Sequence, residues 1–384
     1  MAGSTLGKHF QITTWGESHG KGIGVVIDGC PAGIPLSEET IQAYLNRRKP
    51  GQTKYSTPRK ENDIVTIQSG VFEGRTTGTP ISLAIYNETQ RSADYSEIAG
   101  YYRPGHADFT FDAKYGFRDY RGGGRSSGRE TIGRVAAGAI AAALLKELGI
   151  EVFAFTKSIG PVRCAEDIFA SITGNQPLCA AEGLKRALAA RDASPLFMPD
   201  ADLSLQAEDY LLTTMKETDS AGGIIECIIS GMPAGVGEPV FDKLDADLAK
   251  AIFSIGAVKG FEIGDGFQAA AAKGSENNDA FSGIRDGRAV KTSNHAGGIL
   301  GGLSDGTDIV MRAAIKPTPS IYRSQQTIKR DGTPIDINIK GRHDPVIVPR
   351  AVVVVEAMAA ITAADALLSN MSSRMDRIRV FYSK

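Results

Sequence analysis

The stretch Tyr120-Arg121-Gly122-Gly123-Gly124-Arg125-Ser126-Ser127-Gly128-Arg129-Glu130-Thr131 joins a glycine-rich loop to the start of a helix. Ser127 and Glu130 have the spacing of a capping box, which predicts Ser127 as the N-cap. Apolar residues then recur at helical spacing from Ile132 to Leu144. Gly149 stands where a C-terminal cap is expected. The pattern therefore predicts a helix over 128–148.

The same loop has the properties of an anion-binding site. A helix N-terminus presents free N–H groups and a partial positive charge, and glycines let backbone amides approach a ligand closely. Arginine is suited to bidentate recognition of phosphate and carboxylate groups, and it occurs here at Arg121, Arg125, Arg129 and Arg134. The sequence therefore predicts an anion pocket in front of the helix.

The overall composition is that of a globular enzyme without a strong charge bias. The chain has 384 residues and a net charge of −1 from 43 basic and 44 acidic residues, which argues against a dedicated nucleic-acid or membrane-surface protein. Its four cysteines form no Cys-x-x-Cys pair, so neither a disulfide framework nor a zinc site is expected. The first 14 residues lack the apolar run of a signal peptide, and Glu356 and Asp365 interrupt the apolar stretch 351–368. We expect a cytoplasmic location.

Short strands and Ala-rich helices alternate along the chain. The hydrophobic patterns predict strands over 24–27, 64–69, 81–86, 223–230 and 309–315. They predict helices over 37–47, 128–148, 180–191, 207–218, 243–253 and 349–368. A faint repeat of strand, Pro-Ala-Gly turn and helix occurs at 25–33 and 228–235, as in a fold built from two related halves. The segment 162–206 is expected to be a peripheral insertion, and 322–340 an exposed polar loop near the site.

Four further segments carry chemically active residues. They are Gly16-Glu17-Ser18-His19-Gly20, Arg103-Pro104-Gly105-His106-Ala107-Asp108, Lys316-Pro317-Thr318-Pro319-Ser320 and Gly341-Arg342-His343-Asp344-Pro345. Together with the Arg/Gly/Ser loop, and in this order, they resemble the chorismate synthase family over essentially the whole chain. The segments 262–267 and 293–298 are similar to the same family.

The resemblance implies both a fold and a reaction. The fold would be α+β, a single domain over 1–384 in which a helical layer is sandwiched between antiparallel β-sheets with internal pseudo-symmetry. The reaction would be the 1,4-elimination of phosphate and a C6 hydrogen from 5-enolpyruvylshikimate 3-phosphate to give chorismate. It needs reduced FMN without net redox change, and NADPH is a possible reductant. Family members are homotetramers.

The resemblance also assigns roles to individual residues. His19 would protonate the departing phosphate, His106 would stabilise the reduced flavin by donating toward its N1–C2=O region, and Asp344 would assist proton removal through flavin N5. Three arginines would hold the substrate, namely Arg48, Arg103 and Arg129, and two positions correspond to NADPH, namely Arg48 and Lys54. The residues expected to contact FMN are Arg125, Ser126, Ser127, Gly256, Ala257, Gly301, Lys316, Pro317, Thr318, Pro319, Ser320 and Arg342.

These assignments agree with the chemistry of the ligands. The substrate carries a phosphate and two carboxylates, and FMN carries another phosphate, so the pocket needs many cationic donors. Four positions depart from the common family pattern: Gly128 replaces Ala, Lys54 replaces Arg, Gly256 replaces Asn and Pro319 replaces Ser. The last two remove possible hydrogen bonds to the flavin.

Other interpretations of the same motifs lack support. The His-Asp pairs at 106–108 and 343–344 have no third convergent metal ligand, and a single Arg-Gly-Gly segment in a neutral chain does not indicate RNA binding. The competing hypothesis is a diverged FMN or phosphate-ligand binding protein without lyase activity. Such a binder would need the arginines but not His19, His106 and Asp344 together, so the enzyme is favoured.

Overall fold

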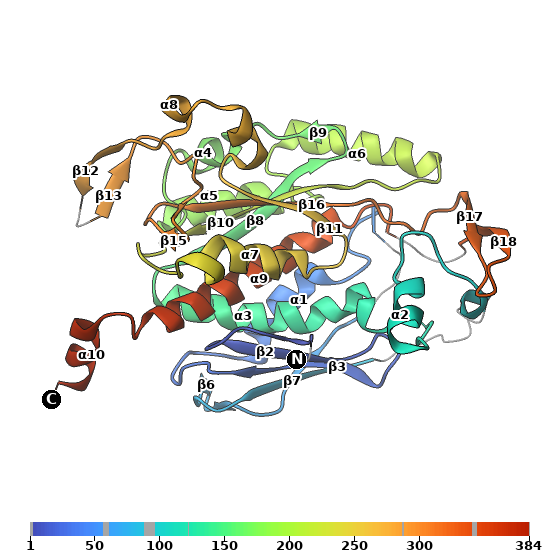
Figure 1. Cartoon of the computed structure of the whole chain (residues 1–384), viewed down its shortest axis with the longest axis horizontal. Coiled ribbons are helices and arrows are strands. Elements are labelled where there is room, and N and C mark those ends of the chain that lie inside the picture. The colour runs from blue at the N-terminus through green and yellow to red at the C-terminus, as the bar shows by residue number, and fades with distance from the viewer. Residues whose placement is uncertain are drawn as a thin grey trace.

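A layer of helices lies between two antiparallel β-sheets (Figure 1). The computed structural model describes residues 3–56, 61–87, 97–121, 123–285, 288–339 and 344–383. The expected α+β sandwich is therefore confirmed. The candidate site lies at one end of this sandwich, where strand ends and helix termini from both halves of the chain meet.

The first sheet comes from the N-terminal part of the chain. Its five antiparallel strands are ordered β1-β2-β3-β7-β4. Their inward residues, such as Ile23, Val25 and Leu83, are fully buried because this face packs on the helical layer. The strands are β1 (Thr5–Leu6), β2 (Gln11–Gly16), β3 (Gly22–Asp28), β7 (Ile81–Tyr86) and β4 (Val65–Ile67), with a small hairpin of β5 (Val71–Phe72) and β6 (Arg75–Thr76) beside them.

The second sheet has the order β11-β16-β10-β8-β9 and is also antiparallel. The strands β10 and β16 have the bounds predicted from sequence, because mostly apolar segments of seven or eight residues there, each with one charged residue, end at polar or glycine positions. The strands are β11 (Val258–Ile263), β16 (Ile309–Ile315), β10 (Gly223–Ser230), β8 (Glu151–Ile159) and β9 (Val162–Arg163).

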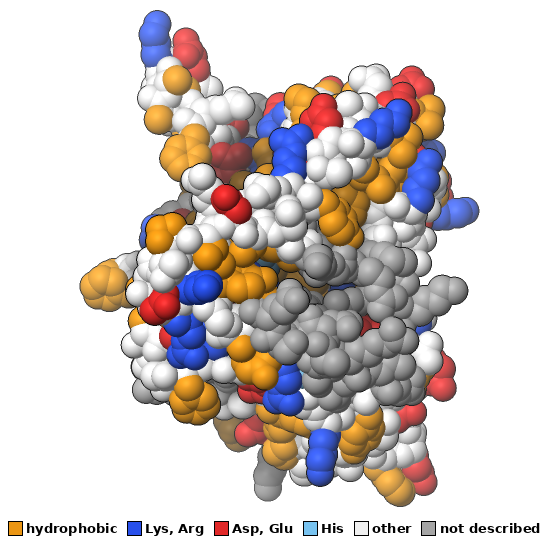
Figure 2. Space-filling view, turned by 90° about the vertical axis from the view of Figure 1, so that its right-hand side faces the viewer, with side chains coloured by type: hydrophobic (Ala, Val, Ile, Leu, Met, Phe, Trp, Pro, Cys, Tyr) orange, Lys and Arg blue, Asp and Glu red, His pale blue; other side chains and the backbone are white. Residues whose placement is uncertain are grey.

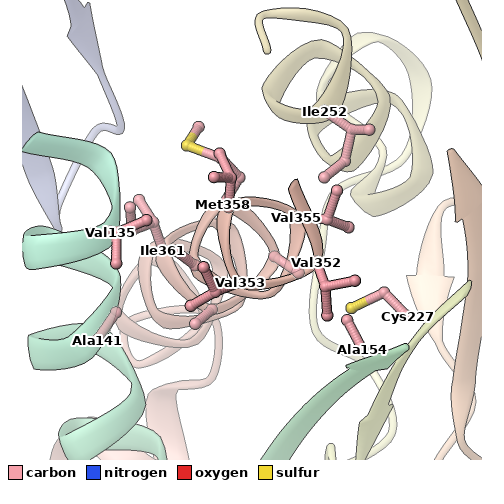
Figure 3. Close-up of a cluster of buried hydrophobic side chains, with 14 of the residues drawn as sticks. Val135, Ala141, Ala154, Cys227, Ile252, Val352, Val353, Val355, Met358 and Ile361 are labelled. Carbon is pink, nitrogen blue, oxygen red and sulfur yellow. The ribbon is translucent and has the colours of Figure 1, made fainter. Parts of the chain in front are cut away.

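Four helices form the middle layer, and α9 lies at its centre. The layer contains α1 (Glu38–Arg48), α3 (Thr131–Glu147), α7 (Leu244–Phe253) and α9 (Val348–Asn370). Figure 3 shows α9 between Val135 and Ala141 of α3 on one side and Ala154 and Cys227 of the second sheet on the other. The helix is long and apolar enough to cross a membrane, but 72% of its most apolar window is buried inside the protein, as in a core helix.

Close packing of α3 on α9 depends on a glycine. A Cβ added at Gly138 would come within 2.3 Å of the Ala357 Cβ, so any side chain there would push the two helices apart. Small residues recur along both helices for this reason, which explains why the sequence around them is rich in alanine.

The remaining elements lie outside the two sheets and the layer. They are α2 (Asp108–Tyr115), α4 (Ile168–Thr173), α5 (Ala181–Asp192), α6 (Ala201–Lys216), α8 (Gly274–Asn277), α10 (Met375–Tyr382) and three hairpins, β12 (Phe281–Arg285) with β13 (Arg288–Lys291), β14 (Ile299–Leu300) with β15 (Leu303–Ser304), and β17 (Ser324–Ile328) with β18 (Pro334–Asn338). Within 162–206, Leu178, Leu196 and Met198 are fully buried, and the segment is bonded to β8, where the Thr156 N–H donates to Phe197 O at 2.9 Å and the Thr156 hydroxyl donates to Leu196 O at 2.6 Å. The expected polar loop over 322–340 is instead largely the β17–β18 hairpin.

The start of α3 differs in detail from the prediction. A 3-10 turn over Gly128–Glu130 comes first, and the α-helix begins at Thr131. Ser127 does cap that turn, since its side chain accepts from the Arg129 N–H. The predicted capping box was wrong because the Glu130 carboxylate is bound instead by Thr14 at 2.8 Å and by Arg134 at 2.7 Å.

The end of α3 agrees with the prediction. Gly149 has φ +69° and follows the last helical turn. Its N–H donates to Lys146 O and the N–H of Ile150 donates to Leu145 O, which is a Schellman arrangement. The helix predicted over 207–218 begins earlier, at Ala201, because Asp200 caps it by accepting from the Leu203 N–H at 2.9 Å.

The faint sequence repeat corresponds to a repeated structural unit. In the first half, Thr76 Oγ1 donates to Pro31 O and accepts from the Ile34 N–H. In the second half, Ser304 Oγ donates to Pro233 O and accepts from the Val236 N–H.

The glycines of the two Pro-Ala-Gly turns are also equivalent. The N–H of Gly33 donates to the carbonyl oxygen of Thr76, and the N–H of Gly235 donates to that of Ser304. Both glycines have positive φ, at +94° and +88°. The expected internal pseudo-symmetry is therefore visible down to single hydrogen bonds.

Candidate active site

The candidate site occupies one end of the helical layer. The turn after β2, the C-terminal end of α1, the N-terminal end of α3, the segment before α2 and the segment after β16 all reach this end (Figure 1). Figure 2 looks onto it and shows a recess near the middle of the face, bordered by hydrophobic side chains with Lys and Arg side chains around them.

A buried carboxylate joins two of the predicted substrate-binding arginines. Asp63 accepts from Arg48 Nη2 at 2.9 Å, and its second oxygen lies 3.2 Å from Arg129 Nη2. The Asp63 side chain is fully buried, as is almost all of Arg48. Burial lowers the pKa of Arg48 to about 10, and Asp63 opposes that shift, so the guanidinium stays charged at neutral pH. Glu61 makes a further ion pair with Arg129.

Arg129 also connects this network to the turn that carries His19. Its Nη2 donates to Asn87 Oδ1 at 2.8 Å. The Asn87 side-chain amide donates to Glu17 O and Gly20 O, on either side of the histidine. Asn87 therefore fixes the backbone of the turn 17–20 relative to α3, and the half-buried His19 is held at the same end of the molecule.

A pocket of about 460 Å³ lies beside the arginine network. Asp344 lines it and forms an ion pair with Arg350, whose Nε donates to Arg48 O at 3.2 Å. The lining brings together three predicted site residues, Lys54, Ser320 and Asp344. Its other members are Gly51, Thr53, Ser56, Met215, Thr218, Asp219, Ser220, Ile321, Tyr322 and Pro345.

His106 is held by hydrogen bonds at both ring nitrogens. Its Nδ1 lies 3.0 Å from the carbonyl oxygen of Pro104, and its Nε2 lies 3.0 Å from Ser320 Oγ. A carbonyl can only accept, so Nδ1 carries the hydrogen, and Nε2 of the neutral ring accepts from the Ser320 hydroxyl. Burial, and then the nearby Arg103 cation, lower the pKa of His106 below its ordinary value. The ring is neutral at pH 7 in this arrangement, and donation from Nε2 requires its protonated form.

Arg103 is engaged by an internal carboxylate. Its Nε and Nη2 donate to the two oxygens of Asp108 at 2.8 and 2.9 Å. Burial alone would raise the pKa of Asp108, but the hydrogen bonds and charge of Arg103 outweigh it and the pKa is lowered. This pair fixes the loop 103–108, and with it His106, on the N-terminal end of α2.

The Arg/Gly/Ser loop lies in front of α3. Arg125 donates to Gly16 O at 3.0 Å and to Thr14 Oγ1 at 2.6 Å, so its guanidinium also braces the end of β2. Ser126 is exposed, and its hydroxyl donates to Gly123 O. Ser127 is half-buried at the start of the 3-10 turn.

The segment after β16 brings further predicted residues beside His106. Lys316 donates from its backbone to Ala257 O and from Nζ to Gly105 O, each at 2.9 Å. Thr318 O accepts from Ser220 Oγ at 2.7 Å. The buried Thr318 Oγ1 has no hydrogen-bond partner among the residues that the structure describes, and a Cβ added at Gly256 would meet open space. The segment therefore offers a polar ligand both an unused hydroxyl and room.

One of the predicted cofactor residues, Gly301, does not join this cluster. Gly301 lies at the tip of the β14–β15 hairpin, beside the N-terminal end of α7, where Gly302 O accepts from the Leu244 N–H. Gly256 follows the other end of that ten-residue helix, about 15 Å away. Arg342 falls outside the described residues.

Searching the described residues for three or more His, Cys, Asp and Glu side chains that could hold a metal ion identifies no such group. The residues that the structure brings together at the site are arginines, lysines, two histidines and carboxylates. Such a set suits a ligand with several anionic groups.

Comparison with known proteins identifies the family. The family model described as chorismate synthase matches residues 10–368. The chain is 68% identical to the chorismate synthase of Lachnoclostridium phytofermentans over 100% of both chains, and 52% identical to that of Methanosarcina mazei over 96% of this chain and 97% of the relative. The chain belongs to the chorismate synthase family. A solved structure, a crystal structure of chorismate synthase, superposes with a TM-score of 0.76 at 32% identity and covers 97% of this chain and 96% of its own.

Membership in the chorismate synthase family fixes the class of chemistry. The chain is a lyase of the shikimate pathway that leads to aromatic amino acids, and it acts on a small-molecule substrate. The family uses a flavin cofactor. The match to the family model includes the described segments that carry His19, His106, Thr318 and Asp344.

Several residues of the site escaped the sequence analysis. Asp63, Asn87 and Arg350 hold predicted residues in place, yet each stands outside a motif. Asp63 has one sequence signal in its favour, an acid two residues before the strand β4, but nothing in the sequence says that Arg48 and Arg129 converge on it. Its positive φ of +47° is visible only in the structure.

Proposed function

We propose that the protein converts 5-enolpyruvylshikimate 3-phosphate into chorismate and phosphate by a 1,4-elimination that requires reduced FMN. The observation that carries this proposal is the convergence of the Arg48–Asp63–Arg129 network, Asp344 and the His106–Ser320 pair at one end of the molecule. A substrate with one phosphate and two carboxylates needs such a group of cations together with acid–base residues.

The residues present suit FMN. The buried Thr318 hydroxyl lacks a partner among the described residues, and Lys316 lies beside it as a cation. Ser126, Ser127 and the N-terminal turn before α3 offer hydroxyls and N–H groups to an anion. When bound, reduced FMN would supply transient electron density that weakens the C–O bond to phosphate. The full proposed set is Arg125, Ser126, Ser127, Gly256, Ala257, Gly301, Lys316, Pro317, Thr318, Pro319, Ser320 and Arg342.

The acid–base residues have separate tasks in this proposal. His19, as an imidazolium, donates a proton to the departing phosphate, and Asn87 holds its turn at the required place. Asp344 serves proton removal, with its carboxylate held by Arg350. His106 is neutral in the arrangement described above, and an anion bound beside it would raise its pKa and let Nε2 donate.

The arginines hold the substrate's anionic groups. Arg48, Arg103 and Arg129 are each oriented by a buried or half-buried carboxylate, which limits the rotamer freedom that substrate binding would otherwise have to restrict. The carboxylates also prevent the arginines from forming an uncompensated cluster of positive charge before the substrate arrives.

The reductant and the assembly form the last part of the proposal. Lys54 lines the pocket with an exposed side chain and, with Arg48, is a candidate contact for NADPH. The protein would be a cytoplasmic homotetramer. The tetramer would explain the position of Gly301, because a glycine that lies too far from Lys316 of its own subunit could approach the flavin of a neighbouring subunit.

An anaerobic assay tests the proposal. The protein is mixed with 5-enolpyruvylshikimate 3-phosphate and chemically reduced FMN, and chorismate and phosphate are followed together. We expect equal amounts of both products, and a repeat with oxidised FMN and NADPH tests the reductant. A folded, FMN-binding protein that forms neither product would contradict the lyase proposal and would favour a diverged binder.

A further inference from the structure

The C-terminal helix α10 presents an apolar stripe that its own chain leaves uncovered. Met375, Ile378 and Tyr382 recur at helical spacing on α10, and Phe381 lies beside them. Phe381 and Tyr382 are 73% and 77% exposed, and Ile378 is only half-buried. Figure 1 shows the helix projecting from the end of α9, away from the body of the protein.

A helix of this length needs a partner. Eight residues are too few for a stable isolated helix in water, because nucleation is costly and few backbone hydrogen bonds repay it. The helix also lies beyond residues 10–368, the part that the family model matches. It is therefore separate from the machinery of the shared reaction, and a surface that covers the apolar stripe would explain its formation.

A matching surface lies on the turn 238–242. Its five residues are all exposed, and Phe241 at its tip is 91% exposed. Val240 has a φ of +71°, a costly conformation for a β-branched residue, so the turn holds its apolar tip outward against local preference. The neighbouring β14–β15 hairpin adds the exposed Leu300.

The internal repeat shows that this turn is not required by the fold. In the first half, Leu36 donates to Gly74 O two residues after Ile34. In the second half, the equivalent bond to Gly302 O comes from Leu244, eight residues after Val236. The additional residues form the exposed turn, so the second half carries a surface feature that its counterpart lacks.

The two surfaces are complementary in charge. Arg377 and Arg379 flank the apolar stripe of α10, and Arg374 precedes it, against one acid, Asp376. Around the turn, the four carboxylates of Glu238, Asp242, Asp245 and Asp247 outnumber the three nearby lysines, Lys8, Lys243 and Lys250. A basic apolar helix therefore fits an acidic apolar turn.

We propose that α10 of one copy of this chain packs on the turn 238–242 of a second copy, and that the second copy returns the same contact. The helix points away from its own body, so a reciprocal exchange between two copies satisfies both surfaces at once. The contact joins Phe381 and Tyr382 to Phe241, with arginines of α10 against carboxylates of the turn.

Cysteine cross-linking between two differently tagged full-length chains tests the contact. In a background with Cys179→Ser, which removes the exposed native thiol among the four cysteines, one chain carries Phe241→Cys and the co-expressed chain carries Tyr382→Cys. Mild oxidation should give a mixed-chain disulfide. The matched control is Val380→Cys, on the opposite face of α10. It should give about 10-fold less mixed-chain disulfide, because its thiol cannot come close enough to the thiol of Phe241→Cys.

Three results would overturn the proposal. The first is the absence of a mixed-chain disulfide in folded protein, and the second is equal cross-linking from Val380→Cys. The third is a chain with both Phe241→Cys and Tyr382→Cys that forms only an intrachain disulfide. A second measurement uses no cysteine: Phe381→Asp and Phe241→Asp should each weaken self-association in sedimentation experiments. Unchanged association in both variants would also overturn it.

Discussion

Two buried arginine–carboxylate networks in this molecule do different work. Glu356, in the middle of α9, accepts from Arg47 of α1 at 2.6 and 2.9 Å, from Arg191 of α5 at 3.3 Å and from the N–H of Ala154 in β8 at 3.2 Å. It ties four elements together inside the core.

Asp63 has the same chemistry in a different place. It joins Arg48 and Arg129 at the end of the layer, beside the pocket lined by Asp344. Both carboxylates are buried, so burial alone does not tell a structural ion pair from a functional one. The position of the cations relative to the pocket does.

The largest effect is expected in the core network. Glu356→Ala leaves Arg47 and Arg191 buried without their shared carboxylate, so we expect a loss of about 3–5 kcal/mol in the free energy of unfolding. Chemical denaturation measures it, and Glu147→Ala, at an exposed position of α3, is the control. A loss below about 1 kcal/mol, the scale of a surface pair, would show that the network is not structural.

The same network predicts a pH dependence. Burial alone would raise the pKa of Glu356, but Arg47 and Arg191 outweigh it, and the pKa is lowered from its ordinary 4.5. A carboxylate with a depressed pKa stabilises the fold fully above its unfolded value and loses this contribution as pH falls through the folded value. Wild-type stability should therefore fall below pH 4.5 more steeply than that of Glu356→Gln.

The next largest effect is expected on catalysis at the pocket end. His19→Ala and His106→Ala should each lower turnover by about 10- to 1000-fold, because each removes an acid–base group, while the protein stays folded. His9→Ala, at an exposed position away from the site, is the control. Wild-type turnover in either site variant would remove the role proposed for that histidine.

A smaller effect is expected from the partner of His106. Ser320→Ala removes the hydroxyl that donates to Nε2, and we expect turnover to fall by about 10-fold, the effect of one lost hydrogen bond. Ser320→Thr keeps the hydroxyl and should restore most of the activity. The pH dependence of turnover should shift in the alanine variant only, and identical profiles in all three proteins would contradict the positioning role.

The sequence predicted well what depends on local pattern. The strands β10 and β16 were predicted at their observed bounds, because mostly apolar segments of this length identify buried strands even with one charged residue in each, Glu226 or Arg312. The Pro-Ala-Gly repeat pointed correctly to two related halves. The start of α3 was predicted less well, since Glu130 could cap its own turn or bind Arg134 and Thr14, and only the fold decides between them.

The site was predictable where a motif carried it and not where distant residues meet. His106 stands in a motif, but its contact with Ser320 spans 214 positions of the chain. Asp63 binds Arg129 from 66 positions away, and no local pattern links the two. Gly301 is the opposite case. The family resemblance groups it with the other cofactor residues, but in this chain it lies beside the N-terminal end of α7, whereas Gly256 follows the C-terminal end.

One paired measurement tests the central claim, that the Asp63 network serves the reaction and the Glu356 network serves the fold. Asp63→Asn and Glu356→Gln are compared in the free energy of unfolding and in anaerobic kcat/KM per folded molecule. We predict that Asp63→Asn loses at least about 10-fold in kcat/KM, as expected when substrate-binding arginines are misplaced, while Glu356→Gln loses mainly stability. Equal kcat/KM in the two variants, or a larger loss in Glu356→Gln, would contradict the account.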